Sequence, residues 1–144
     1  MTNKYKKYTD EAKVYDVAKR TPLDYQALLS TRLNNQIYLK REDLQSVFSF
    51  KIRGAYNKLT HLDKKIRDKG IIAASAGNHA QGVAMAAKTL GCKATIVMPK
   101  TTPTIKTNAV RKFGAEVGLH GISLCESLED AQEIEEIQGL SFID

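Results

Sequence analysis

The sequence predicts an α/β fold in which a parallel sheet is covered by helices on both faces. The first observation is that short apolar runs recur after residue 70, at 71–74, 94–98, 115–119 and 140–143. The second is that a stretch long enough for a helix follows each of the first three runs, which is the pattern of β-α-β units. Because such crossover connections join parallel strands, we expect the four runs to form one parallel sheet.

Smaller elements are expected before the sheet. Thr9 is a suitable N-cap for a first helix that ends before Pro22. The next elements are an extended segment, a short helix, a turn and a strand, at residues 21–23, 25–33, 34–35 and 36–40. The strand is predicted because Ile37 and Leu39 alternate with polar residues.

A helical period begins at Ser49. Apolar residues then recur at spacings that place them on one helical face, namely Ile52, Ala55, Tyr56, Leu59 and Ile66. Ser49 is the expected N-cap of this helix, which puts Lys51 in its first turn.

Glycines are expected to end the three later helices, at positions 91, 114 and 139. Thr102 followed by Pro103 predicts the start of the second of these helices, and Ser123 with Glu126 forms a capping box at the start of the third. The side chains expected to face inward are Ala80, Val83, Ala84 and Ala87 in the first helix, Ile105, Ala109 and Phe113 in the second, and Leu124, Leu128, Ala131, Ile134 and Ile137 in the third.

Composition allows one ordinary core and argues against several classes of function. Of the 144 residues, 42% are hydrophobic and 26% are charged. No apolar run approaches the roughly 18 residues of a membrane span, and Cys92 and Cys125 lack metal-binding spacing. The net charge of +6 comes without interleaved aromatic residues, so nucleic-acid binding is not expected. The sequence therefore favours a cytoplasmic protein with no metal site and no membrane or nucleic-acid partner.

Lys51 is a candidate nucleophile. A lysine attacks a carbonyl only when it is neutral, so its pKa must be lowered. The positive end of a helix, burial between Phe50 and Ile52, and the charge of Arg53 would each act in that direction. From position alone, an ordinary surface lysine is the stronger alternative.

The segment from Ser75 to His79 is a candidate anion site. It lies where a strand passes into a helix, so consecutive backbone N–H groups point at one spot. The small residues Ala76 and Gly77 would let a ligand approach the backbone. Asn78 is a candidate ligand because an amide both donates and accepts, whereas for His79 a hydrogen-bonded histidine at a helix start is favoured over a proton shuttle. The spacing of a phosphate-binding P-loop is present, but its lysine and hydroxyl residue are absent, and so is a dinucleotide fingerprint.

The charged segment 40–45 precedes Lys51. From the residues alone, it is interpreted as a charged loop rather than as part of a site.

Five segments, in order and at family spacing, resemble the threonine dehydratases (threonine ammonia-lyases), which are fold type II enzymes of the tryptophan-synthase-β type that use pyridoxal 5'-phosphate (PLP). They are Thr21–Leu23, Tyr38–Gln45, Ser49–Ala55, Ser75–Ala84 and Met98–Val117. The resemblance implies that Lys51 forms a Schiff base with PLP, that Phe50 packs on the cofactor ring and that Asn78 bonds the phenolate oxygen of the ring. It also implies that the substrate carboxylate is held by Ser75, Ala76, Gly77, Asn78 and His79.

The implied reaction deaminates L-threonine to 2-oxobutanoate and ammonia, with Lys51 taking the Cα proton and the β-hydroxyl leaving. The residues from Gln45 to Ser49 look more like the isoleucine-biosynthetic form than the catabolic form. Serine racemases carry a second serine where this chain has Ala76, so elimination is expected over racemisation. A serine dehydratase or serine-racemase-like enzyme acting on L-serine, and a non-catalytic anion-binding α/β module, remain as alternatives.

The resemblance also implies a division of the chain. Residues 1–50 would be an N-terminal segment of the large PLP-binding domain, and residues 51–144 would be the smaller mobile α/β domain. In the family, a glycine-rich phosphate loop and a hydroxyl residue opposite the pyridine nitrogen come later in the sequence. The chain is therefore expected to be an N-terminal portion that is inactive alone, and the intact enzyme is expected to be a homo-oligomer.

Overall fold

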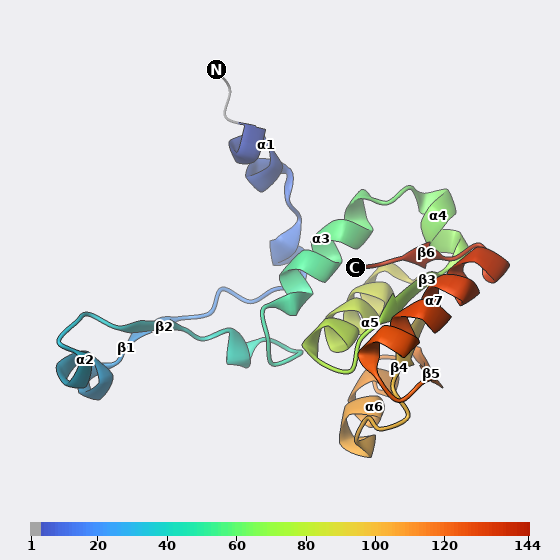
Figure 1. Cartoon of the computed structure of the whole chain (residues 1–144). Coiled ribbons are helices and arrows are strands. Elements are labelled where there is room, and N and C mark those ends of the chain that lie inside the picture. The colour runs from blue at the N-terminus through green and yellow to red at the C-terminus, as the bar shows by residue number, and fades with distance from the viewer. Residues whose placement is uncertain (1–3) are drawn as a thin grey trace.

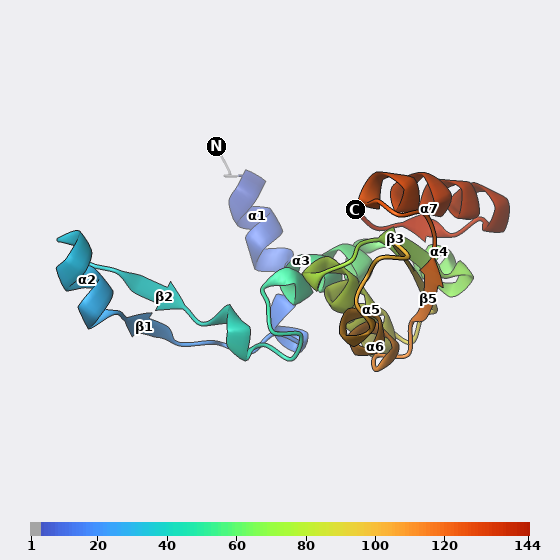
Figure 2. The same cartoon turned by 60° about the horizontal axis from the view of Figure 1, so that its bottom comes forward.

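The computed structural model describes residues 4–144, and it has the predicted α/β fold. Figures 1 and 2 show a sheet with helices packed around it, and a thin arm that projects away from this body. The arm contains β1 (Leu23–Tyr25), α2 (Ala27–Leu33) and β2 (Tyr38–Lys40), and its two strands pair antiparallel.

The body contains a four-stranded parallel sheet in the order β5-β4-β3-β6. The strands are β3 (Ile71–Ala74), β4 (Ala94–Met98), β5 (Glu116–Leu119) and β6 (Ser141–Phe142). All three neighbouring pairs are parallel, and Ile71 lies opposite both Ala94 and Ser141. The four apolar runs in the sequence therefore form one parallel sheet, as predicted.

Helices cover both faces of the sheet, as Figure 2 shows. On one face, α7 (Leu124–Gln138) packs its Ala131 against Ile72 and Val97. The opposite face is covered by α3 (Lys51–His61), α5 (Asn78–Leu90) and α6 (Thr104–Arg111), which share a core with the sheet. The strands alternate between these two cores because successive side chains point to opposite faces.

Three predicted helix starts were wrong. Thr9 lies near the end of α1 (Lys4–Glu11), where its hydroxyl donates to the carbonyl of Tyr5, and the chain continues into a short 3-10 turn, η1 (Val14–Asp16), rather than into a helix reaching Pro22. Lysines paired with acidic residues four positions later stabilise α1 upstream of Thr9. Ser49 is buried with an unpaired hydroxyl, and Phe50 occupies the N-cap position. Pro103, not Thr102, occupies the N-cap position of α6.

The predicted helix from Ser49 to Ile66 is two helices. The backbone turns extended at Leu62, and α4 (Lys64–Lys69) begins after it, so Ile66 does not share the buried face of α3. Some side chains expected to face inward are instead exposed, Ile105 at 79% and Ile137 at 75%. The capping box at Ser123 is present, because its hydroxyl accepts from the N–H of Glu126. Gly91 and Gly139 end α5 and α7 in the left-handed conformation.

Several apolar side chains of the arm are exposed, namely Leu23, Tyr25, Leu28, Leu33 and Tyr38. From residue 4 to residue 144, no helix has both the length and the apolar character needed to cross a membrane.

Candidate active site

A hollow of about 230 Å³ lies between α3, the first turn of α5 and the carboxyl end of β6. Its lining residues are Phe50, Lys51, Gly54, Ala55, Lys58, His79, Ile143 and Asp144. In open parallel sheets ligands bind beyond the carboxyl ends of the strands, so this is the edge where a site is expected. The hollow brings together Phe50, Lys51 and His79, which the sequence analysis singled out in two separate segments.

Lys51 is the first residue of α3 and its side chain is exposed. Its Nζ lies 5.7 Å from the centroid of the Phe50 ring, and Phe50 is itself 60% exposed. Ile52 is fully buried in the core, because consecutive helical residues point in different directions. The expected burial of Lys51 between Phe50 and Ile52 was therefore wrong. Lys51 and Phe50 form an open amine and ring pair at the edge of the hollow.

A close approach between α5 and α3 fixes where Lys51 lies. Gly82 of α5 faces the backbone of Lys51 so closely that a Cβ at position 82 would lie 3.0 Å from the Lys51 carbonyl carbon and 3.1 Å from its oxygen. Asn78 lies one helical turn before Gly82, on the same face of α5. The glycine contact thus sets the start of α3 beside the first turn of α5.

The N-terminus of α5 is uncapped. Its N-cap is Gly77, which has no side chain and around whose Cβ position nothing lies within 4 Å. The Ser75 hydroxyl accepts from the N–H of Gly77 at 3.3 Å, while the N–H of Ser75 itself donates to Val97. The first-turn N–H groups of a helix have no partner within the helix, and they lie at the positive end of its dipole. This end of α5 can therefore bind a carboxylate or a phosphate.

His79 already has a protein partner. Its Nε2 lies 3.2 Å from the carbonyl oxygen of Ile143, an arrangement that places the ring proton on Nε2. This is the hydrogen-bonded histidine favoured from the sequence. Across the hollow, Lys58 forms an ion pair with Asp144 and lowers the pKa of that carboxyl group.

Arg53 does not act on Lys51 as expected. Its guanidinium forms two hydrogen bonds with the carboxylate of Glu42, Nε to Oε2 at 2.8 Å and an Nη to Oε1 at 2.9 Å. The Arg53 charge is thus neutralised by Glu42 instead of being directed at Lys51. This ion pair lowers the pKa of Glu42 to about 2, with smaller contributions from Thr21 and Gln45, although burial acts in the opposite direction.

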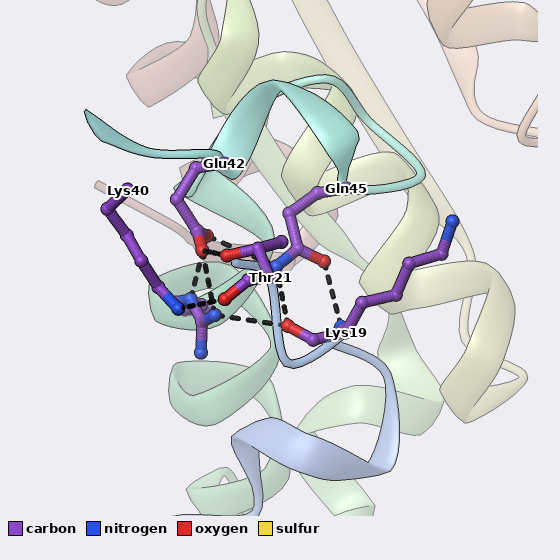
Figure 3. A network of polar contacts seen from close by, with 6 residues as sticks. Lys19, Thr21, Lys40, Glu42 and Gln45 are labelled. Carbon is purple, nitrogen blue, oxygen red and sulfur yellow. Dashed lines mark hydrogen bonds and ion pairs between the residues drawn. The ribbon is translucent and has the colours of Figure 1, made fainter. Parts of the chain in front are cut away.

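The segment 40–45 was interpreted as a charged loop, but two of its polar side chains, Glu42 and Gln45, are largely removed from solvent. Figure 3 shows Lys19, Thr21, Lys40, Glu42 and Gln45 joined by hydrogen bonds around one carboxylate. Gln45 is 1% exposed. Glu42 and Arg53 lie eleven residues apart, and no helical or strand periodicity of the sequence indicates that these two polar residues form a pair.

A family model described as pyridoxal-phosphate dependent enzyme matches residues 14–144. The chain belongs to this family. Similar relatives include the biosynthetic L-threonine dehydratase IlvA of Pasteurella multocida, 53% identical over 139 residues, and threonine dehydratase 1 of Solanum lycopersicum, biosynthetic and chloroplastic, 55% identical over 132 residues. These alignments cover 96% and 92% of this chain but 27% and 22% of the relatives. The chain thus spans about a quarter of the length of these relatives.

Solved structures of PLP enzymes have the same fold. The processed form of threonine deaminase isoform 2 from Solanum lycopersicum superposes with a TM-score of 0.93 and 48% identity, over all of this chain and 40% of that one. Maize serine racemase superposes with a TM-score of 0.90 and 30% identity, over 96% of this chain and 43% of that one. The predicted fold type and the resemblance to threonine dehydratases are both confirmed.

The residues of the hollow fit the family's cofactor. A PLP enzyme needs a reachable lysine amine, an apolar surface for the pyridine ring and donors for anionic groups. Lys51 and Phe50 supply an exposed amine beside an exposed aromatic ring, and the uncapped start of α5 supplies N–H donors one helical turn from the Gly82 contact. The open space at Gly77 lets a ligand approach that backbone.

Proposed function

We propose that this chain is the lysine-bearing part of a threonine ammonia-lyase, which deaminates L-threonine to 2-oxobutanoate and ammonia. The observation that carries the proposal is the placement of Lys51 beside Phe50, with its backbone against the helix whose uncapped start can bind a carboxylate. Relatives named threonine dehydratase, at more than half identity over most of the chain, support the choice of substrate.

In this proposal Lys51 has two roles. Its amine is the point at which PLP attaches, and when free it accepts the proton from Cα of the substrate. PLP, when bound, supplies an electron sink for the pair left behind as the Cα–H bond breaks. Because Lys51 starts α3 and its side chain reaches the solvent, the amine can swing between these roles without disturbing the core formed by Ile52 and Ala55.

The turn from Ser75 to His79 binds the substrate carboxylate in our proposal. Backbone N–H groups at the start of α5 are the donors, and Ala76 and Gly77 keep side chains out of the way. The exposed amide of Asn78 bonds the phenolate oxygen of the cofactor ring. His79, held by Ile143, lines the same hollow and orients the carboxylate rather than moving a proton.

Ala76 favours elimination. Serine racemases carry a serine at this position, and in our proposal the methyl group of Ala76 cannot supply the second proton donor and acceptor that racemisation would need. A serine-racemase-like enzyme is the second candidate, because maize serine racemase shares the fold at a TM-score of 0.90.

Four further expectations stay proposals. The first is the division into a large-domain segment up to residue 50 and a smaller domain from residue 51; the arm with β1, α2 and β2 projects from the body in Figure 1, whereas Ala18 and Val47 pack in the core of the body. Relatives named biosynthetic support a role in isoleucine biosynthesis. Homo-oligomerisation and a cytoplasmic location are proposed from the sequence, although some relatives are chloroplastic or mitochondrial.

The experiment that tests the function uses a hybrid enzyme, in which this chain replaces the 139 aligned residues of the Pasteurella multocida relative. The hybrid, the isolated chain and the unaltered relative are assayed with L-threonine and L-serine for release of the 2-oxo acid. We expect the hybrid to act on threonine in preference to serine and the isolated chain to be inactive. A folded, PLP-loaded hybrid with no activity on threonine would contradict the proposal.

A further inference from the structure

The carboxylate of Glu42 lies at the centre of a network that joins three segments of the chain. Its side chain is 14% exposed and that of its partner Arg53 is 24% exposed. Thr21 donates its hydroxyl proton to the same carboxylate at 2.6 Å, and Gln45 donates from Nε2 at 3.2 Å. With the two bonds from Arg53, both carboxylate oxygens are fully used, so the geometry of the group is strongly restrained.

A second set of hydrogen bonds joins the same segments of the chain. The buried amide of Gln45 accepts from the N–H of Lys19 and donates to the Lys19 carbonyl, both at 2.9 Å. Arg53 also donates to that carbonyl at 3.2 Å. The 19–21 segment, the 42–45 turn and the first turn of α3 are therefore held as one unit (Figure 3).

The network can orient Lys51 only through the backbone. Residues two apart on a helix do not face each other, so Arg53 and Lys51 point in different directions from the same turn. We propose that Glu42 is a positioning residue for Lys51: by holding Arg53 it fixes the first turn of α3 against Gly82 of α5, and so aims the Lys51 amine into the hollow. The inference rests on the proposed role of Lys51 as the amine that binds PLP.

The chain provides a matched control for a purely electrostatic or structural effect. Asp43, next to Glu42, forms an equivalent two-point ion pair with Arg41, at 2.9 and 2.8 Å. The Arg41–Asp43 pair is more exposed than the Glu42–Arg53 pair. Arg41 also forms an ion pair with Asp24, which lies in the arm and not in α3. Asp43→Asn therefore removes the same chemistry from the same loop without releasing the start of α3.

The test measures where PLP attaches in the full 144-residue chain. Wild type, Glu42→Gln and Asp43→Asn are incubated with excess PLP and reduced with borohydride, and the modified lysines are quantified by peptide mass spectrometry. Lys58, on α3 and in the same hollow, is the internal reference. We expect the ratio of modified Lys51 to modified Lys58 to fall by about fivefold in Glu42→Gln, as roughly 1 kcal/mol of lost orientation would give, and to stay unchanged in Asp43→Asn.

Two additional variants make the result independent of global unfolding. Glu42→Asp keeps the charge and shortens the reach, so an intermediate ratio is expected even where the glutamine variant does not fold. Arg53→Gln combined with Glu42→Gln should lower the ratio by less than the two single losses added together, because both changes break the same Glu42–Arg53 ion pair. The inference would be overturned by a wild-type ratio of modified Lys51 to modified Lys58 in folded Glu42→Gln or in Glu42→Asp. It would also be overturned by fully additive losses of this ratio in the double variant, or by an equal loss in Asp43→Asn. Absence of selective modification at Lys51 both in the wild-type chain and in the hybrid enzyme would instead overturn the proposed function.

Discussion

Gly82 and Lys51 are in direct backbone contact: a Cβ at position 82 would lie 3.0 Å from the carbonyl carbon of Lys51 and 3.3 Å from the amide nitrogen of Ile52. The absence of a side chain at Gly82 lets the start of α3 lie on α5. The lysine that is proposed to react and the helix start that is proposed to bind the substrate carboxylate are thereby placed beside each other.

Gly82→Ala is expected to destabilise the chain. A helical glycine replaced by alanine would ordinarily stabilise the helix by about 1 kcal/mol. Here the added methyl group overlaps the backbone of Lys51, and overpacking of this kind costs about 1–3 kcal/mol. Urea unfolding measures the difference in the free energy of unfolding between the variant and wild type. Gly54→Ala in α3 is the matched control, because nothing lies within 4 Å of its Cβ position, and it should be neutral or stabilising. An equal change in the free energy of unfolding of the two variants would show that the close contact at Gly82 does not affect stability.

Glu42→Gln is expected to lower stability in a pH-dependent way. The ion pair with Arg53 depresses the pKa of Glu42 in the folded chain from its ordinary 4.5 to about 2. The ionised group therefore contributes stability that is fully present above about pH 4.5 and is lost as the pH falls toward 2. At pH 7 the variant should be less stable by about 1–3 kcal/mol.

Urea unfolding of wild type and Glu42→Gln across this pH range measures the effect. The difference between the two should be constant from pH 7 to about 4.5 and should shrink below it. Asp43→Asn should lower stability much less, because its ion pair with Arg41 is more exposed. A difference that stays constant down to pH 2.5, or that grows, would contradict the assignment.

The parallel sheet and the strand, helix and turn of residues 23–40 were predictable, whereas the bounds of the first helix were not. The two central strands, β3 and β4, are rich in apolar residues, and tertiary packing agrees with that local signal because Ile71 and Ala94 are buried. The edge strand β5 begins at Glu116, and its Leu119 is 40% exposed. Thr9 is a hydroxyl residue of the kind that caps helices, as Ser123 is, but it lacks a partner like Glu126 three residues later, and its hydroxyl bonds back to Tyr5. A hydroxyl residue can satisfy either geometry, so the sequence alone does not decide between them.

Sequence patterns single out Phe50, Lys51 and His79, which line the hollow, but not the contacts that hold them there. Lys51 and the turn from Ser75 have local signals, a helix start and a strand-to-helix turn. Their proximity depends on Gly82, and the placement of Arg53 depends on Glu42; both are contacts between distant segments. Sequence alone therefore predicts that Arg53 acts on Lys51 through its charge, whereas the structure pairs Arg53 with Glu42.

Ala76→Ser is expected to change the balance of products in the hybrid enzyme. A hydroxyl at this position would provide a second proton donor and acceptor, so racemisation of L-serine should rise relative to elimination. Chiral chromatography of D-serine, together with the assay for the 2-oxo acid, measures the ratio. Ala80→Ser, a buried position further along α5, controls for a general effect of an added hydroxyl. No D-serine from the Ala76 variant would exclude residue 76 as the determinant, while leaving the lyase proposal intact.

The central claim is that Lys51 is the lysine to which PLP binds. The most direct measurement is peptide mass spectrometry of the hybrid enzyme after PLP loading and borohydride reduction, with Lys51→Ala and Lys58→Ala as paired variants. The account predicts one stoichiometric adduct, on Lys51, retained in Lys58→Ala. In Lys51→Ala the account predicts loss of the adduct, of the visible absorbance of bound PLP and of threonine deamination, while the far-UV circular dichroism is unchanged. A stoichiometric adduct on any other lysine, or full activity in folded Lys51→Ala, would contradict it.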